Sequence, residues 1–89
     1  MPKYVLSGSY CSDVLTKREP YRQAHLDGLT KQKEDGLLVT AGPTKDLTKF
    51  FSIYDAPDEE AIRELFENDP YWLNGIWTEY ELKEWIQVF

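Results

Sequence analysis

The sequence predicts an α+β fold in which a four-stranded antiparallel sheet carries two helices on one face. Segments with strand-like alternation and segments with helical periodicity follow one another in the order β-α-β-β-α-β, which is the split βαβ arrangement of ferredoxin-like folds. Glycine or proline marks most boundaries between these segments. The chain has 89 residues, a length typical of one domain, and we therefore expect residues 1–89 to form a single domain.

The first expected strand spans residues 3–10, where side chains of two kinds alternate along the chain. One side of this strand carries Tyr4, Leu6, Gly8 and Tyr10, and the other carries Val5, Ser7 and Ser9. Residues 11–19 are polar and are interpreted as a connection. Its Lys17 and Arg18 are expected to border the part of the protein that this connection covers. Pro20 then fits the first turn of a helix, where its missing N–H costs nothing.

Residues 21–36 are predicted to form that helix, which carries the only histidine of the chain, His25. His25 lies near the middle of the face expected to turn toward the core, in a stripe formed by Tyr21, His25, Gly28, Leu29 and Gln32. The helix alone favours a core histidine satisfied by one hydrogen bond, whereas the rest of the chain favours a functional one. Gly28 would let another element or a ligand approach this face, and Gly36 is expected to end the helix with a positive φ.

A hairpin is expected after the helix. Residues 37–41 form an apolar run that is long enough for a buried strand and too short for a helix. Gly42 and Pro43 are expected to break this strand, and residues 43–49 form a polar loop. Residues 50–54 then continue as the third strand.

The last third of the chain predicts a second helix and a final strand. Pro57 marks the start of the helix, whose apolar stripe consists of Ala61, Ile62, Leu65 and Phe66. The sequence Asn-Asp-Pro at 68–70 stops it, because the residue before a proline is pushed out of the helical region. A short helical turn is expected over residues 70–75 and the last strand over residues 78–89.

Composition excludes several classes of function. The formal net charge of −6 argues against binding to a nucleic-acid backbone. The chain has a single cysteine, Cys11, which excludes an internal disulfide framework and suits a reducing cytoplasm. The sequence also lacks a signal-peptide pattern, and it lacks an apolar run long enough to cross a bilayer. With one histidine and one cysteine, a dedicated metal site is not expected, and no motif of a phosphate-bound cofactor is present. We therefore expect a cytoplasmic protein without cofactor, metal, nucleic-acid partner or membrane partner.

The aromatic content of 15% is high for so short a chain. Two helices on one face leave the other face of the sheet bare, and a sheet that carries tyrosine, tryptophan and leucine is not expected to stay exposed. We expect a homodimer in which two copies pack through the open sheet faces. Pairing edge to edge through the last strand is the alternative.

Four pieces of the sequence together resemble the YCII family. They are Arg22-x-x-His25-Leu26, then Gly36-x-Leu38-x-x-Ala41-Gly42-Pro43, then Asp69-Pro70-Tyr71-x-x-x-Gly75, and finally Trp85. The resemblance spans nearly the whole chain, with the pieces in the order and spacing of the family. It implies the fold of the dimeric α+β barrels, which agrees with the order of elements derived above.

The resemblance also implies an active site. The His-Asp dyad of the family corresponds to His25 and Asp69, and the proline thought to orient that dyad corresponds to Pro70. One branch of the family removes chloride from a chlorinated, hydroxylated aromatic ring by proton transfer. This chain departs from the family at Gln23, where a proline is common, in the short loop after the second strand, and over residues 11–18. The substrate therefore stays open, because entrance residues would come from that last stretch.

A carboxylate beside an imidazole fixes its tautomer and raises the basicity of the far nitrogen, which suits general acid–base work. Arg22, Tyr71 and the backbone amides near Gly42 are candidates to hold an anionic or phenolic substrate. Each residue also has a structural interpretation: Asp69 as a helix stop, Arg22 as a solvated ion-pair partner and Tyr71 as a core contact. The strand serines, Ser7, Ser9 and Ser52, are in positions that could face the pocket, but nothing in the sequence distinguishes one of them as a site residue.

Two classes of function follow from these residues. The first is a small cofactor-free enzyme, a lyase, isomerase or dehydrochlorinase that moves a proton on a cyclic or phenolic substrate. The second is a non-catalytic dimeric module that binds a small molecule or a partner protein. A buried His-Asp pair beside a cavity would favour the enzyme, and a pair surrounded by packed side chains would favour the module.

Overall fold

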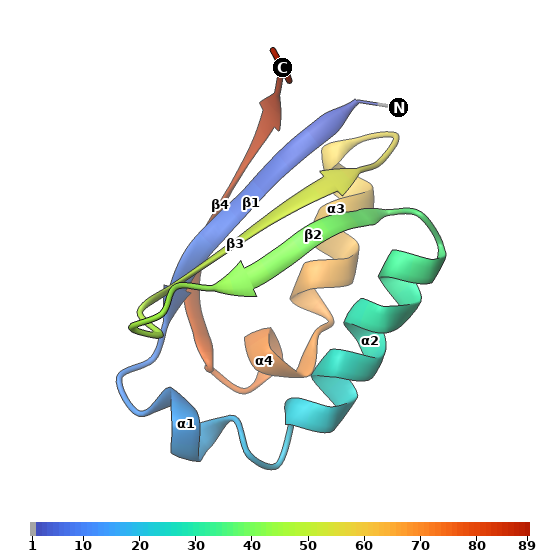
Figure 1. Ribbon diagram of the computed structural model, residues 1–89. Coiled ribbons are helices and arrows are strands. Elements are labelled where there is room, and N and C mark those ends of the chain that lie inside the picture. Colours follow the sequence, from blue (N-terminus) through green and yellow to red (C-terminus); the bar gives the residue numbers. More distant parts are fainter. Residues whose placement is uncertain (1) are drawn as a thin grey trace.

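The computed structural model describes residues 2–89 (Figure 1). In chain order these residues form β1 (Lys3–Tyr10), α1 (Val14–Lys17), α2 (Arg22–Glu34), β2 (Leu38–Pro43), β3 (Lys49–Asp55), α3 (Glu59–Glu67), α4 (Pro70–Leu73) and β4 (Trp77–Trp85). The strands and the two long helices follow the predicted order β-α-β-β-α-β, which is confirmed. The short helix α4 lies where a helical turn was expected, and α1 is an additional helix within the predicted connection.

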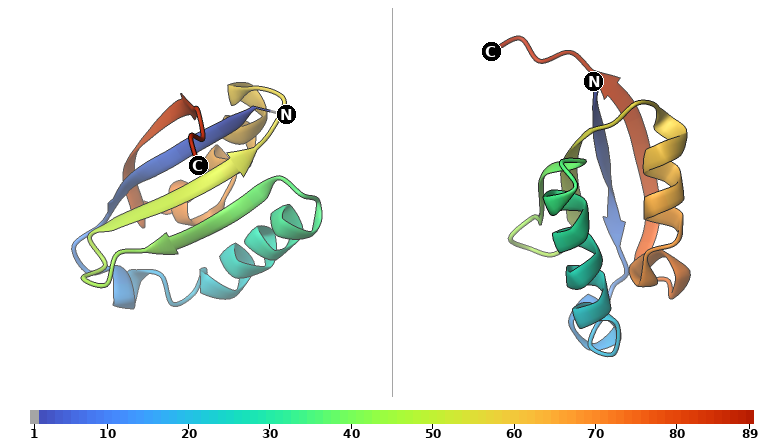
Figure 2. Two further views of the ribbon diagram at one scale, coloured as in Figure 1. Left: turned by 45° about the horizontal axis from the view of Figure 1, so that its top comes forward. Right: turned by 90° about the vertical axis from the view of Figure 1, so that its right-hand side faces the viewer.

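The strands form one antiparallel sheet in the order β2-β3-β1-β4. The two central strands are β1 and β3, and Leu6 of β1 lies opposite Ser52 of β3 and Leu82 of β4. Both long helices lie on the same face of this sheet (Figures 1 and 2). The ferredoxin-like α+β fold predicted from the sequence is therefore confirmed.

The hydrophobic core fills the space between the sheet and the helices. Alternate residues of β1 point into it, with Tyr4 at 5% and Leu6 at 2% exposure, as the period-two pattern predicted. From the helix side α3 contributes Ile62 and Phe66, while α2 contributes His25 and Gln32. A polar helix face and an apolar helix face thus cover neighbouring parts of one sheet.

Both long helices begin one or two residues later than proposed from their prolines. Tyr21 is the N-cap of α2 and Asp58 is the N-cap of α3, so Pro20 and Pro57 lie before the first turn and not in it. The side chain of Asp58 accepts a hydrogen bond from the backbone N–H of Ala61 at 2.9 Å. A side-chain cap of this kind fixes the first turn without help from a proline.

Of the two glycines with an expected role at α2, Gly36 has that role in the structure and Gly28 does not. Gly36 follows α2 with φ of 78°, which confirms the predicted helix end. Gly28 does not mark a close approach. Within residues 2–89, a Cβ atom at this position would have no atom within 4 Å apart from its chain neighbours and the nearby backbone of α2. The close approach lies at Gly8, where a Cβ atom would clash with the carbonyl oxygen of Glu79 and the ring of Phe50.

Two strand boundaries differ from the prediction. Gly42 and Pro43 belong to β2 and do not break it, because β2 is an edge strand and can contain a residue without an N–H. The last strand ends at Trp85 and not at Phe89, because Trp85 pairs with Lys3, the first residue of β1. Residues 86–89 pair with no strand of the part of the chain that the structure describes, and they extend away from the sheet (Figure 2).

The open face of the sheet is less aromatic than expected. The strand tyrosines and Leu82 lie on the helix-covered side, while the open side carries Val5 and Ile53 at its centre. Phe51 and Trp85 are partly exposed, at 47% and 38%. The argument for a covered face therefore rests on these four side chains and not on tyrosine and leucine. Within residues 2–89 no helix is long and apolar enough to span a membrane.

Candidate active site

The site is assembled from α2 and the short helix α4. His25 is on the inward face of α2, and its side chain is 7% exposed. Asp69 is the N-cap of α4 and its side chain is 5% exposed. The sequence brings Asp69 to this place because α3 ends at Glu67, with Asn68 as its C-cap, and Pro70 lies in the first turn of the next helix.

His25 and Asp69 are in direct contact. Nδ1 of His25 lies 2.9 Å from each carboxylate oxygen of Asp69. A carboxylate can only accept, so Nδ1 must carry the proton and donate it, which leaves Nε2 as the basic nitrogen of the neutral ring. No hydrogen-bond partner of Nε2 is found within residues 2–89.

Asp69 also caps α4. Its Oδ1 accepts a hydrogen bond from the backbone N–H of Tyr71 at 2.8 Å. The carboxylate is thus held by the first turn of α4, whose φ at position 70 is fixed by the proline ring. Both sequence-based interpretations of Asp69, helix boundary and histidine partner, apply to the same side chain.

Aromatic rings fix the plane of the imidazole. Tyr71 stacks on His25 with ring centroids 3.7 Å apart and an interplanar angle of 10°. Trp77 contacts the same ring edge-on, at 5.1 Å and 83°. A histidine held by a hydrogen bond, a stacked ring and an edge contact has little freedom to rotate, so Nε2 keeps one direction.

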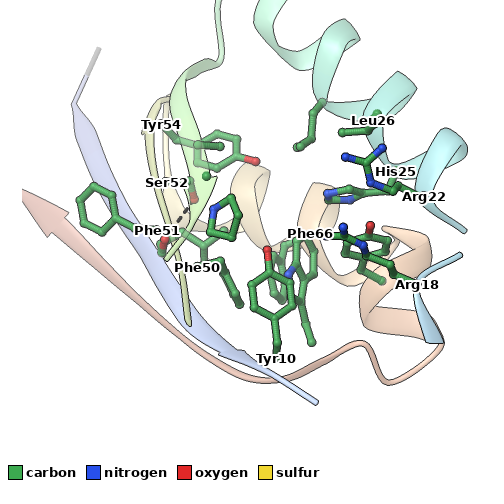
Figure 3. A pocket seen from close by; sticks show the side chains of 17 residues that line it. Tyr10, Arg18, Arg22, His25, Leu26, Phe50, Phe51, Ser52, Tyr54 and Phe66 are labelled. Atoms are coloured by element: carbon green, nitrogen blue, oxygen red, sulfur yellow. Dashed lines mark hydrogen bonds between the residues drawn. The ribbon is translucent and has the colours of Figure 1, made fainter. Parts of the chain in front are cut away.

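A cavity of about 180 Å³ lies beside His25 (Figure 3). A cavity of about 150 Å³ is large enough for benzene, so this one matches a single substituted ring. The residues proposed as substrate contacts, Arg22, Gly42 and Tyr71, all line it together with His25. Asp69 and Pro70 do not line it, because Asp69 lies behind the imidazole at Nδ1.

The α2 side of the cavity carries two arginines. Arg18, at the C-terminal end of α1, lines the cavity beside Arg22, whereas Lys17 does not. Within residues 2–89 neither guanidinium forms an ion pair. Burial raises the pKa of Tyr71, and the positive charges of Arg18 and Arg22 act in the opposite direction. Two free positive charges at one cavity in a chain of net charge −6 favour an anionic ligand.

Of the opposite wall, only Ser52 was named from the sequence, as one of three strand serines that could face the pocket. This wall is formed by side chains of β3, including Ser52 and Tyr54, with Phe50 between the cavity and the core. Tyr10 closes the wall from the end of β1, and burial raises the pKa of its phenol. Among residues 2–89 no group of three His, Cys, Asp or Glu side chains is placed to hold a metal ion.

Comparison with known proteins gives one family and several similar structures. The model of the YCII-related domain matches residues 2–86. The structure is similar to 5-chloro-2-hydroxyhydroquinone dehydrochlorinase (TftG) from Burkholderia phenoliruptrix AC1100 in complex with 2,5-dihydroxybenzoquinone, with a TM-score of 0.81 and 24% identity over 94% of this chain and 93% of that one. It also resembles protein Atu4242 from Agrobacterium tumefaciens, with a TM-score of 0.58 and 14% identity over 97% and 92% of the two chains. A third match is protein PA3566 from Pseudomonas aeruginosa, with a TM-score of 0.57 and 8% identity over 98% and 93%. No curated protein matches the chain in sequence.

Proposed function

Because this chain belongs to the YCII-related domain family, we propose that it is a small cofactor-free enzyme of the lyase or isomerase type, which moves a proton on a cyclic or phenolic substrate. One observation carries the proposal. The His25–Asp69 pair is buried, and His25 lines a cavity of the size of one ring while its Nε2 has no protein partner within residues 2–89. A buried pair beside a cavity supports the enzyme over the non-catalytic module.

In the proposed mechanism His25 acts as the general base and acid. Nε2 takes a proton from the substrate, and the imidazolium that forms is stabilised by the carboxylate of Asp69 at Nδ1. Pro70 and the Tyr71 N–H orient that carboxylate, and the Tyr71 ring holds the imidazole plane. Arg22 attracts the negative charge of the substrate, and the backbone at Gly42 borders the ring. General acid–base catalysis of this kind contributes about 10²–10⁴-fold to a rate.

The first substrate to test is 5-chloro-2-hydroxyhydroquinone, the compound named for the similar dehydrochlorinase. Loss of hydrogen chloride from such a ring requires one proton to pass to a base and one chloride ion to leave with the electrons of the C–Cl bond. The reaction balances without an oxidant or a reductant. A single ring of this kind matches the volume of the cavity, and its acidic hydroxyl groups match the arginine side.

The decisive variants are Asp69→Asn and His25→Gln, tested by chloride release from that substrate. Asp69→Asn keeps the shape of the side chain but removes its charge and its control of the tautomer, so we expect the rate to fall by about 10²-fold or more. His25→Gln should have an effect at least as large. Asp27→Asn serves as the control, because Asp27 is on the exposed side of α2, where its carboxylate accepts a hydrogen bond from Gln23 Nε2 at 2.9 Å.

Circular dichroism of each variant must show an intact fold. Full activity in either dyad variant on a confirmed substrate would reject the proposal and leave His25 as a core histidine.

We further propose that the protein is a homodimer whose subunits pack through the open sheet faces. Val5 lies at the centre of this face, opposite Ile53 on one side and Lys83 on the other, and Phe51 adds a ring at 47% exposure. Val5→Glu would place a charge in the centre of the contact, so sedimentation of this variant should give a monomer and that of the parent a dimer. A monomeric parent at micromolar concentration would reject the proposal.

A further inference from the structure

Two hydroxyl groups of β3 line the wall of the cavity that faces the arginines. Ser52 and Tyr54 are two residues apart in the strand, so their side chains point to the same face of the sheet. Both residues line the cavity beside His25, and both are buried, at 5% and 4% exposure. Figure 3 shows them on one side of the cavity, with Arg18 and Arg22 on the other.

Each of these hydroxyl groups donates its only hydrogen to an acceptor within the protein. Ser52 Oγ donates to the backbone carbonyl of Leu6 at 3.0 Å. Tyr54 Oη donates to the side-chain oxygen of Gln32 at 2.5 Å. A hydroxyl group has one donor and two acceptor lone pairs, so the lone pairs that remain can only accept hydrogen bonds.

Gln32 determines this state of Tyr54. Gln32 lies on α2 two turns after His25, on the same inward face, and is 8% exposed. The 2.5 Å separation from Tyr54 is in the range of an O–H···O bond and below that of an N–H···O bond, which assigns the amide oxygen to the contact. Burial, and secondarily the charge of Asp69, raise the pKa of the Tyr54 phenol, so the hydrogen stays on the phenol at neutral pH.

We propose that Tyr54 and Ser52 form a hydrogen-bond-accepting wall that selects substrates with a hydroxyl group at this end of the cavity, and that Gln32 is the positioning residue that keeps Tyr54 an acceptor. The inference rests on the proposed function and narrows its substrate class. With Arg18 and Arg22 opposite, the selected substrate is a single ring that carries an anionic group at one end and a hydroxyl group at the other. A substituent that cannot donate would leave lone pairs of two buried oxygens without a partner, which is unfavourable.

Binding of matched benzoates tests the inference without knowledge of the natural substrate. The probes are 3- and 4-hydroxybenzoate and their partners 3- and 4-fluorobenzoate, which have nearly the same size but lack the hydroxyl donor. Dissociation constants are measured by isothermal titration calorimetry at pH 7. For the intact protein we expect at least one hydroxybenzoate to bind about tenfold more tightly than its fluoro partner.

Three variants separate the positioning role from general stability. Tyr54→Phe removes the accepting oxygen and should reduce the hydroxy-over-fluoro ratio to about threefold or less. Gln32→Leu frees the hydrogen of Tyr54 to turn into the cavity and should reduce the ratio in the same way. Gln32→Glu keeps an accepting oxygen at the same place and should preserve the ratio. Gln23→Leu, the same substitution on the exposed side of α2, is the control and should leave the ratio unchanged.

The outcomes distinguish this inference from the proposed function. Equal dissociation constants within both hydroxy and fluoro pairs in the intact protein would overturn the accepting wall alone. An unchanged ratio in Gln32→Leu, or a reduced ratio in Gln32→Glu, would overturn the positioning role of Gln32. Failure of all the benzoates to bind at millimolar concentration would overturn both the wall and the proposed single-ring anionic substrate. If Gln32→Leu does not fold, Tyr54→Phe still tests the accepting wall and Gln32→Glu still tests the positioning role.

Discussion

The helices α2 and α3 cover the same face of one sheet, yet the interiors beneath them differ. Under α3, Phe66 stacks on Trp77 with ring centroids 4.5 Å apart and on Phe50 at 5.9 Å, and Ile62 is fully buried. Under α2, the inward side chains are His25 and Gln32, and a cavity of about 180 Å³ remains. The aromatic cluster is packed under α3, and its rings Phe50, Phe66 and Trp77 form one border of the cavity that remains under α2.

The difference shows how a small fold separates stability from chemistry. A packed ring makes many dispersion contacts and removes apolar area from water, so α3 should contribute most of the stability. An unfilled cavity gives up part of that stability, and it leaves His25 Nε2 available to a ligand. Substitutions in the two halves should therefore have opposite consequences for stability and activity.

The largest effect is expected from truncation of Phe66. Phe66→Ala should destabilise the protein by about 3–5 kcal/mol, because it removes a ring that is 3% exposed and contacts four other aromatic residues. Leu29→Ala is the comparison under α2, where Leu29 is only half-buried and borders the cavity, and should cost about 1 kcal/mol. Urea unfolding measures both values. Equal losses would contradict the division between a stabilising half and a functional half.

The fold was predictable from the sequence because its elements have local signatures. Alternation in residues 3–10 gave the central strand with its correct faces, and Gly36 gave the end of α2. The errors occurred where tertiary context overrides local preference. Gly42 and Pro43 are tolerated in β2 because that strand is at the edge of the sheet, and the final strand is limited by the length of β1.

The site was predictable only in part. His25 was found as a singular residue on an inward stripe, but Asp69 was paired with it through resemblance to a family, since 44 residues separate the two in sequence. The wall of Ser52 and Tyr54 depends on how β3 faces α2, which no local pattern encodes. The contact of Tyr54 with Gln32 joins two such elements. Of the two cations expected to border what lies beneath the connection, Arg18 lines the cavity and Lys17 does not.

The tyrosines of the two halves should respond differently to alkaline pH. Burial raises the pKa of Tyr54 strongly, whereas Tyr80 beside α3 is more exposed and Arg63 opposes the rise in its pKa. A tyrosine with a raised pKa in the folded state contributes stability that is fully present below the unfolded value near about 10, and that is lost as pH rises through the folded value. The free energy of unfolding should therefore fall above about pH 10.

Urea unfolding at several pH values between neutrality and the alkaline limit measures this fall. Tyr54→Phe should reduce its steepness, and Tyr80→Phe should change it less. If the two substitutions change the pH dependence equally, ionisation of Tyr54 affects the free energy of unfolding no more than ionisation of Tyr80, and this difference between the two regions is rejected.

The smallest effects are expected at two glycines of the α2 region, and they have opposite signs. Gly36 has a φ of 78°, so Gly36→Ala forces a Cβ atom into the left-handed region and should cost about 1 kcal/mol. Gly28 is inside α2 with space around the position of a Cβ atom, so Gly28→Ala should stabilise the protein by about 0.5–1 kcal/mol through the greater helix propensity of alanine. Unfolding in urea gives both signs in one experiment. If Gly28→Ala destabilises the protein, the inward face of α2 is more tightly packed than its cavity implies, and the contrast between the two helices is smaller than proposed.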